Sequence, residues 1–187
     1  GDGDDKFGVV IDVTDEIVKR KRIEEERDTD PLTELYNRRG LEMRLSALSE
    51  AGEPLAYRAF VMIDADNLKV VNDTYGHEAG DTYLKEIAGR LKEQAPDRCV
   101  AARLGGDEFA LFLYRYASDE ELLEVIRRLE RLQEGSPAVL ADNISVFIRF
   151  SLGYSLTEEN KDYQVLLKEA DEKMYENKRE RKAAVCE

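Results

Sequence analysis

Apolar positions recur along the chain with two different periods, one typical of helices and one of strands. The run AFVMID (59–64) is apolar on both faces, which favours a central strand. Alternating apolar residues from Ile144 to Leu152 predict one long strand with a single buried face. A spacing of three or four residues predicts four helices, marked by Leu41, Leu45 and Leu48; by Leu84, Ile87, Ala88 and Leu91; by Leu122, Ile126 and Leu129; and by Tyr163, Leu167, Ala170 and Met174.

The segment RLGGDEFALFLY (103–114) predicts a β-hairpin. CVAAR (99–103) and EFALFLY (108–114) are rich in strand-forming residues and flank the turn LGGD. Gly76 and Gly80 are expected to punctuate a loop. The resulting order is helix, strand, helix, hairpin, helix, strand and helix. This order indicates an α+β domain with a central, mostly antiparallel sheet flanked by helices.

The N-terminal residues carry weaker patterns. FGVVIDVTDE (7–16) predicts a short strand that ends in a turn. The following run EIVKRKRIEEERD (16–28) has only Ile17, Val18 and Ile23 as apolar positions. It is therefore a poor core helix and is typical of a solvated or coiled connector. On composition alone, a frayed N-terminal tail is the simpler interpretation.

Composition and charge exclude several classes of function. Of the 187 residues, 42% are hydrophobic and 37% charged, and no apolar run approaches the roughly 18–20 residues of a membrane helix. We expect no direct membrane contact in this segment, which leaves open a membrane tether elsewhere in the protein. The net charge of −13 argues against nucleic acid as a partner but allows a small phosphorylated ligand carried with a divalent metal ion. Cys99 and Cys186 fit no metal or redox spacing, which favours a reducing, cytoplasmic setting.

Acidic residues follow the central strand and stand in the turn of the hairpin. Asp64 and Asp66 lie where AFVMI ends, and Asp107 and Glu108 lie between the two glycines and the next strand. If the two strands pair, these carboxylates converge and raise one another's pKa unless a cation neutralises them. Hard oxygen ligands of this kind suit Mg²⁺. The competing interpretation is that Asp64 and Asp66 cap the next turn or helix, so the metal hypothesis depends on the two clusters meeting.

The segment KVVNDTYGHEAGD (69–81) holds candidates for reading a nucleobase. Asn72 and Asp81 suit a base edge, because a carboxylate accepts both the N1–H and the N2 amino hydrogens of guanine. Taken alone, the pattern favours a turn-stabilising Asn72 and an Asp81 in the first turn of a helix. His77, the single histidine, is expected at a turn rather than as a general base. Candidates for phosphate contacts are the basic residues Lys69, Lys178 and Arg181.

Together these residues resemble the GGDEF domains, the diguanylate cyclases of bacterial signalling. The resemblance spans residues 28–182, with two long motifs and three short ones in the family's order. They are DPLTELYNRR (30–39), IDADNLKVVNDTYGHEAGD (63–81), RLGGDEF (103–109), SLGY (151–154) and EADEKMYENK (169–178). The resemblance implies a palm-like sheet with a ferredoxin-like core, as in adenylyl cyclases and polymerases. It also implies condensation of two GTP molecules to cyclic di-GMP with release of two pyrophosphates.

The resemblance also implies a role for individual residues. The expected metal ligands are Asp64, the carbonyl of Ala65, Asp107 and Glu108, with Mg²⁺ or Mn²⁺ as the cofactor. The expected catalytic residues are Asp107, Glu108 and Lys69. The expected substrate-binding residues are Asn67, Leu68, Lys69, Asn72, Asp81, Gly105, Gly106, Lys178 and Lys182. Among them, Asn72 and Asp81 match the guanine-reading pair, and the two glycines let the nucleotide approach the backbone closely.

The implied reaction also defines the partners. Metal ions activate the 3′-hydroxyl and neutralise the charge that develops at the α-phosphate. Each domain holds one GTP, so catalysis requires a homodimer. The resemblance divides the chain into the end of a PAS-like sensor domain with a signalling-helix linker (1–27) and a GGDEF domain (28–187). The linker becomes a dimerising connector, although its weak heptads lead us to expect a largely monomeric isolated domain.

The sequence departs from the family pattern at several places. Glu34 replaces the usual glycine of LTGLYNRR, and Asn67 stands where an aromatic residue or histidine is common. After the EADEKMYENK motif an arginine contact falls on Lys182, a point charge without the planar fork of arginine. The product-inhibition motif Arg-x-x-Asp falls on Pro96 and Cys99, so we expect no feedback inhibition through that site.

Two other functions stay open at the level of the sequence. A catalytically silent GGDEF module would bind GTP or relay a signal through protein contacts, and the loss of the turn acids or of Asp81 would favour it. Neither is lost. A relaxed nucleotide choice would give mixed purine dinucleotides, which Asp81 disfavours because a carboxylate repels N1 of adenine. The leading hypothesis is an active diguanylate cyclase.

Overall fold

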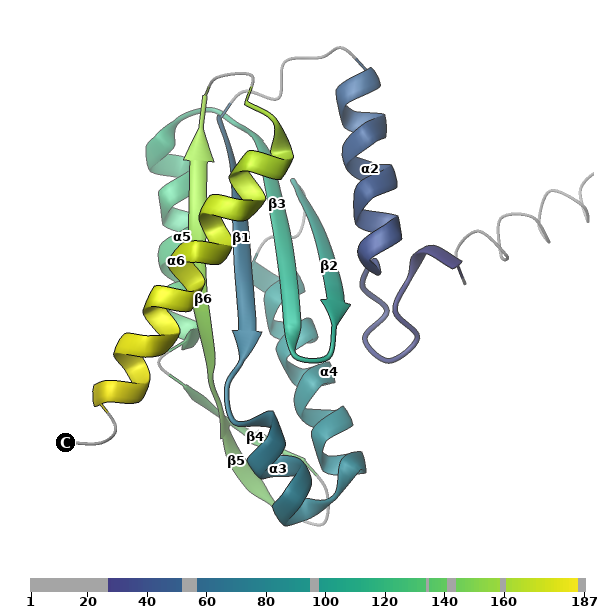
Figure 1. Ribbon diagram of the computed structural model, residues 1–187, viewed down its shortest axis with the longest axis vertical. Coiled ribbons are helices and arrows are strands. Elements are labelled where there is room, and N and C mark those ends of the chain that lie inside the picture. Colours follow the sequence, from purple (N-terminus) through teal and green to yellow (C-terminus); the bar gives the residue numbers. More distant parts are fainter. Residues whose placement is uncertain are drawn as a thin grey trace, which may run out of the picture.

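The computed structural model describes residues 27–51, 57–94, 98–133, 135–140, 144–158 and 161–184. The strand expected over 7–16 and the PAS-like end with its linker lie outside the described residues, except for the last linker residue. The elements in chain order (Figure 1) are α2 (Arg38–Glu50), β1 (Tyr57–Ala65), α3 (Leu68–Tyr75), α4 (His77–Gln94), β2 (Cys99–Gly105), β3 (Glu108–Tyr116), α5 (Asp119–Gln133), β4 (Ser136–Val139), β5 (Ser145–Ile148), β6 (Phe150–Thr157) and α6 (Tyr163–Ala184).

Four strands form one antiparallel sheet in the order β2-β3-β1-β6 (Figure 1). With the helices between them, these strands follow a βαββαβ path in which β1 and β3 are central, as in ferredoxin-like folds. Every residue of β1 from Arg58 to Ala65 is buried, which matches its apolar sequence. The structure confirms the predicted α+β class and the predicted pairing of β1 with β3.

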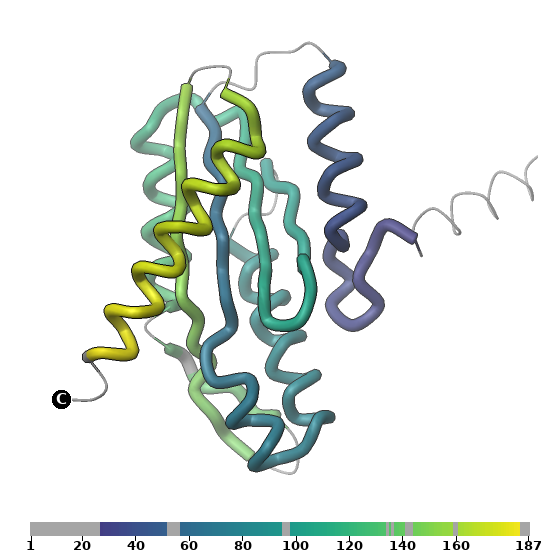
Figure 2. Tube along the Cα trace, viewed as in Figure 1, coloured from purple at the N-terminus to yellow at the C-terminus, as the bar shows by residue number. Residues whose placement is uncertain are grey.

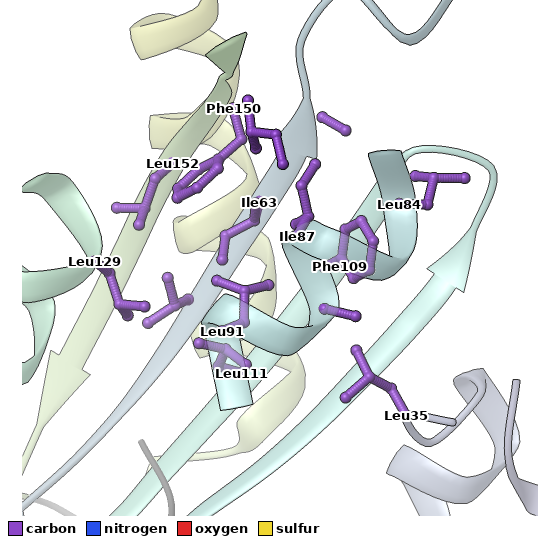
Figure 3. Packing of buried hydrophobic residues seen from close by; sticks show 14 of the residues in the cluster. Leu35, Ile63, Leu84, Ile87, Leu91, Phe109, Leu111, Leu129, Phe150 and Leu152 are labelled. Atoms are coloured by element: carbon purple, nitrogen blue, oxygen red, sulfur yellow. The ribbon is translucent and has the colours of Figure 1, made fainter. Parts of the chain in front are cut away.

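Helices cover both faces of the sheet and create two hydrophobic cores. On one face, α4 and α5 pack over the cluster in Figure 3, which includes Ile63, Ile87 and Leu111. On the other face, α2 and α6 cover Phe60 and Phe112. Successive residues of β1 contribute to alternate cores, which is why the strand is apolar on both sides. In the described part of the chain, none of the helices is long and apolar enough to cross a membrane.

The single strand expected from Ile144 to Leu152 is wrong, because the segment forms two strands in two sheets. β5 pairs with β4 in a separate two-stranded sheet, and β6 joins the main sheet beside β1 after a break at Arg149. β5 buries Ile148 and β6 buries Phe150 and Leu152, so the alternation of apolar residues continues across the break and gives no sign of it. β4 was not expected, because it has only four residues and one of them is proline.

The loop expected around Gly76 and Gly80 is also wrong, because the residues on both sides of Gly76 are helical. α3 ends at Tyr75 and α4 begins at His77, so Gly80 lies inside α4. Gly76 alone separates the two helices and has a φ of +86°, which glycine adopts without strain. The glycines favour a loop in the sequence, but one forms the junction and the other permits close packing of α3 on α4.

Candidate functional site

The end of β1 and the turn between β2 and β3 lie at the same end of the sheet (Figure 2). The register of β1 and β3 brings the predicted acids together there. Asp64 lies opposite Glu108 in the register of β1 and β3. The backbone N–H of Ala65 donates to the carbonyl of Asp107 at 2.8 Å, which ties the turn to the end of the strand. The structure therefore meets the condition on which the metal hypothesis depends.

The turn itself is shaped by two glycines. Gly105 and Gly106 have φ values of +145° and +54°, where L side chains are strained, and a Cβ at either position would meet nothing within 4 Å. Glycine is thus required here by backbone conformation and not by crowding. The open space beside both residues is available to a ligand.

Lys178 supplies the positive charge that the converging acids require. Its ammonium donates to Asp64 Oδ1 at 2.5 Å, although the two residues are 114 positions apart in the sequence. Burial raises the pKa of the Asp64 carboxyl, and the neighbouring Asp107 and Asp66 raise it further, against the influence of Lys178. Burial alone lowers the pKa of Lys178, but the three acids together raise it above its ordinary value. The ammonium therefore stands where this cluster needs a cation.

The donor groups of the cluster fit a hard divalent cation by their chemistry. Asp64, Asp107 and Glu108 offer carboxylate oxygens and Ala65 offers a carbonyl, the ligand types that Mg²⁺ prefers. Within the described ranges, no three His, Cys, Asp or Glu side chains are already grouped for a metal ion. A cation that binds Asp64 competes with the ammonium of Lys178 for this carboxylate.

A cavity of about 750 Å³ opens beside the acids. The start of α3 forms one wall, where Asn67 has a φ of +63° and the helix begins at Leu68. The first N–H groups of a helix lack partners within it and carry partial positive charge, so they suit a phosphate. Basic side chains from α3, α6 and the β5–β6 junction complete the lining, namely Lys69, Arg149, Lys178, Arg181 and Lys182. The cavity thus joins acids suited to a metal ion with cations suited to phosphates.

Four residues that line this cavity are not among the site residues that the resemblance implies, namely Asp66, Val70, Arg149 and Arg181. Arg149 is exposed at the break between β5 and β6. No role was assigned to it from the sequence, because one continuous strand was expected there. Arg181 donates to the carbonyl of Gln133 at 2.9 Å, and its Nε lies 3.8 Å from Asp66 Oδ2. The sequence suggested Arg181 only as one of several basic residues that could contact phosphate. It is three residues from Lys178, a spacing that places both side chains on one side of α6.

The expected guanine-reading residues lie where α3 meets α4 and are not among the described residues that line the cavity. A Cβ on Gly80 would lie 1.9 Å from Asn72 Oδ1, so Asn72 packs against α4 where only glycine fits. Asp81 follows Gly80 directly and is exposed. Since α4 begins at His77, Asp81 is in the second helical turn, and the placement of Asp81 in the first turn is wrong.

Residues 27–184 match the family model described as "Diguanylate cyclase, GGDEF domain". The chain belongs to the GGDEF family. It is 37% identical to diguanylate cyclase DgcN of Escherichia coli (strain K12) over 152 residues, and 40% identical to diguanylate cyclase TpbB of Pseudomonas aeruginosa over 153 residues. These alignments cover 81% of this chain but only 37% and 35% of the relatives, so the chain spans little more than a third of their length.

Solved structures of GGDEF domains share the fold of this one. The GGDEF domain of TpbB from Pseudomonas aeruginosa gives a TM-score of 0.72 at 38% identity, covering 81% of this chain and 89% of that one. The coiled coil and GGDEF domain of DgcB from Caulobacter crescentus, in complex with c-di-GMP, gives 0.77 at 25% identity, covering 89% and 88%. The predicted GGDEF fold is therefore confirmed.

Two departures from the GGDEF pattern fall on left-handed backbone. Glu34 has a φ of +58°, which explains why a glycine is usual at this position of the family. The left-handed φ of Asn67 favours asparagine, which tolerates this conformation better than most residues. This GGDEF domain thus carries backbone strain at Glu34 and little at Asn67.

Proposed function

We propose that this chain is an active diguanylate cyclase, which condenses two GTP molecules to cyclic di-GMP and releases two pyrophosphates. The observation that carries the proposal is the meeting of Asp64, Asp107 and Glu108 beside a cavity rich in basic side chains. Phosphoryl transfer needs this combination, because acids hold divalent cations and basic groups hold the phosphates. The relatives named diguanylate cyclases support the same reaction.

The acids at the end of the sheet form the proposed metal site. The residues that would hold Mg²⁺ or Mn²⁺ are Asp64, the carbonyl of Ala65, Asp107 and Glu108. When bound, the metal activates the attacking 3′-hydroxyl and neutralises charge at the α-phosphate. The adjoining turn keeps Asp107 and Glu108 at the strand end through the hydrogen bond from Ala65.

The basic residues of the cavity form the proposed phosphate site. Lys69 and the N–H groups of Asn67 and Leu68 bind phosphate oxygens at the start of α3, where the helix dipole favours negative charge. Lys178 and Lys182 contact the phosphates from α6. Lys69 also acts in catalysis, because it neutralises charge that develops as pyrophosphate leaves.

The contact of α3 with α4 forms the proposed base-binding site. Asp81 accepts the N1–H and N2 amino hydrogens of guanine, and Asn72 reads the same base. Gly105 and Gly106 leave room for the nucleotide to approach the turn. Adenine lacks a hydrogen at N1, so we expect GTP to be strongly preferred over ATP.

A second copy of the domain completes the proposed reaction. Each domain supplies one set of these residues, whereas the product joins two GTP molecules, so two domains must face each other as a homodimer. We assign residues 1–27 to the end of a PAS-like sensor domain and a linker that pairs the two copies. The enzyme works in the cytoplasm, where its separated cysteines stay reduced.

Product analysis tests the proposal directly. The protein is incubated with Mg²⁺ and GTP, ATP or both, and we expect cyclic di-GMP only where GTP is present. The rate per molecule should rise with protein concentration, because two domains must meet. Asp107→Ala should lower the rate at least about 100-fold, since it removes a ligand of the metal that stabilises the transition state.

The matched control is Asp171→Ala on α6, an aspartate that is exposed. It should leave the rate unchanged. Bound GTP with no dinucleotide at high protein concentration would instead identify a catalytically silent module. Mixed purine dinucleotides would contradict the role of Asp81.

A further inference from the structure

Arg103 connects the GGDEF turn to a distant part of the chain. Its Nε and Nη2 donate to the carbonyl of Gly106 at 3.1 and 2.7 Å. Its Nη1 donates to Asp30 Oδ1 and Oδ2 at 3.1 and 3.2 Å, across 73 positions of sequence. Only 12% of the Arg103 side chain and 19% of the Asp30 side chain are exposed, so solvent weakens this ion pair less than a surface pair. One guanidinium therefore holds a turn carbonyl and a remote carboxylate together.

Asp30 is itself fixed by its local structure. Its Oδ1 accepts from the backbone N–H of Thr33 at 2.9 Å and from Thr33 Oγ1 at 2.7 Å. Its own N–H donates to the carbonyl of Leu35 at 2.7 Å. These hydrogen bonds fix the Asp30 carboxylate, so both of its oxygens are held in place for the guanidinium of Arg103.

The segment that contains Asp30 lies beside β2, an edge strand of the sheet. In Figure 2 it is the purple loop next to that strand. Tyr36 donates to the carbonyl of Ala101 at 3.1 Å and accepts from the N–H of Arg103 at 2.8 Å. The match to the family begins at residue 27, so this segment is the first part of the domain that follows the N-terminal connector. Among the residues of this network, Asp30 therefore lies nearest in sequence to the N-terminal connector.

We propose that Arg103 is a positioning residue that couples the segment of residues 28–37 to the GGDEF turn. Displacement of this segment moves Asp30, releases or reorients the guanidinium, and shifts the carbonyl of Gly106. Asp107 is the next residue, so the same movement changes the placement of a proposed metal ligand. The role in catalysis rests on the proposed cyclase function, whereas the mechanical coupling does not.

Two conservative substitutions test the coupling. Arg103→Lys keeps the charge but loses the planar fork, whose separate nitrogens hold Gly106 and Asp30 in a fixed geometry. Asp30→Asn keeps the shape of Asp30 and weakens its hold on the guanidinium. In each we expect amide hydrogen exchange of residues 106–108 to be at least about fivefold faster, and kcat to fall about tenfold with little change in the KM for GTP.

The double variant separates coupling from two unrelated losses. If the two residues act through each other, Asp30→Asn combined with Arg103→Lys should be no worse than Arg103→Lys alone. The matched control is Arg98→Lys, whose guanidinium pairs with exposed Glu121 at the opposite end of β2. It should change neither exchange at the turn nor kcat.

Additive effects of the two substitutions, or unchanged exchange at residues 106–108, would overturn the proposal. Thr33→Val provides a milder perturbation should Asp30→Asn fail to fold, because it removes only one hydrogen bond to Asp30. It should accelerate exchange at the turn by a smaller factor. If the unmodified protein makes no cyclic di-GMP, the proposed function fails, while the exchange measurements still decide the coupling.

Discussion

Lys178 has two alternative partners, the Asp64 carboxylate and a phosphate of the proposed substrate. In the structure its ammonium neutralises Asp64, whereas the proposed reaction places it on a phosphate and a divalent cation on Asp64. Metal binding to Asp64 therefore competes with this ion pair. The phosphates of GTP offer the displaced ammonium a new partner, so metal and nucleotide should bind cooperatively.

Replacing Lys178 tests whether its ammonium competes with a divalent cation for Asp64. In Lys178→Met we expect nucleotide-free protein to bind Mn²⁺ about tenfold more tightly, because no ammonium competes for Asp64 and the acids are left unneutralised. Affinity for GTP should fall in the same variant. Electron paramagnetic resonance of free Mn²⁺ during a titration measures the first effect.

The matched control for that titration is Lys173→Met. Lys173 also lies on α6, but it donates to the carbonyl of Tyr154 and is exposed. Its replacement should leave Mn²⁺ affinity unchanged. Equal Mn²⁺ affinities of the unmodified protein and Lys178→Met would show that the ammonium does not oppose the metal.

Glu34 is a site where one residue costs stability. Its φ of +58° strains a side chain, and its exposed position gives the side chain little to gain. Glu34→Gly should therefore raise the free energy of unfolding by about 0.5–1 kcal/mol, after the entropic cost of glycine in the unfolded chain. Urea unfolding measures the change.

Glu42→Gly gives a control of opposite sign. Glu42 is exposed in the interior of α2, where glycine should lower the free energy of unfolding by about 1 kcal/mol. A loss of stability in both variants would mean that the backbone at residue 34 is not strained.

At the scale of elements, the docking of α6 on the sheet places the lysines of the proposed phosphate site. α6 buries Leu166, Ala170 and Met174 against the sheet, and the same helix carries Lys178 and Lys182 to the cavity. The helix can approach closely because its neighbour in β6 is glycine. A shift of α6 therefore moves the core contact and the site together.

Gly153→Ala should separate α6 from β6. A Cβ at this position would lie 2.0 Å from the backbone N of Met174 and 2.4 Å from the carbonyl of Ala170, so backbone has to move. We expect a loss of about 3 kcal/mol in the free energy of unfolding and weaker GTP binding. Urea unfolding and a GTP titration of the folded variant measure the two effects.

Gly89→Ala is the matched control for this substitution. A Cβ at Gly89 would meet nothing within 4 Å, and the residue lies in the interior of α4. Alanine should stabilise the helix by up to about 1 kcal/mol there. If both alanine variants unfold at the same urea concentration, close approach of α6 is not what glycine provides.

At the scale of the whole molecule, we predict that the proposed cyclase is not inhibited by cyclic di-GMP at the position of the family's Arg-x-x-Asp motif. Cys99 begins β2, and burial raises the pKa of its thiol to about 12, so it stays neutral and offers no carboxylate to a bound product. Pro96, which falls on the arginine of the motif, has no side-chain donor. A titration with cyclic di-GMP should leave the initial rate unchanged apart from competition with GTP. Potent non-competitive inhibition would contradict this prediction.

Local patterns were enough to predict the central features of the site. An apolar strand followed by Asp64, and a glycine turn followed by Asp107, are properties of short segments, since strand ends and tight turns depend on neighbouring residues. The pairing of β1 with β3 then brings these acids to the same end of the sheet. The helices marked by Leu41, Leu84 and Leu122 were predictable for the same reason.

Other features were decided only by tertiary structure. The sequence from Ile144 to Leu152 alternates whichever sheet each half joins, so its division at Arg149 depends on which strands are available as partners. The ion pair of Lys178 with Asp64 depends on how α6 docks against β6 and β1. The sequence by itself determined that acids stand at the end of an apolar strand and in a glycine turn, because both features depend on neighbouring residues. Their convergence needed the pairing of β1 with β3, which is a long-range contact. Which cation faces those acids was decided by the tertiary structure, because that contact joins groups 114 residues apart.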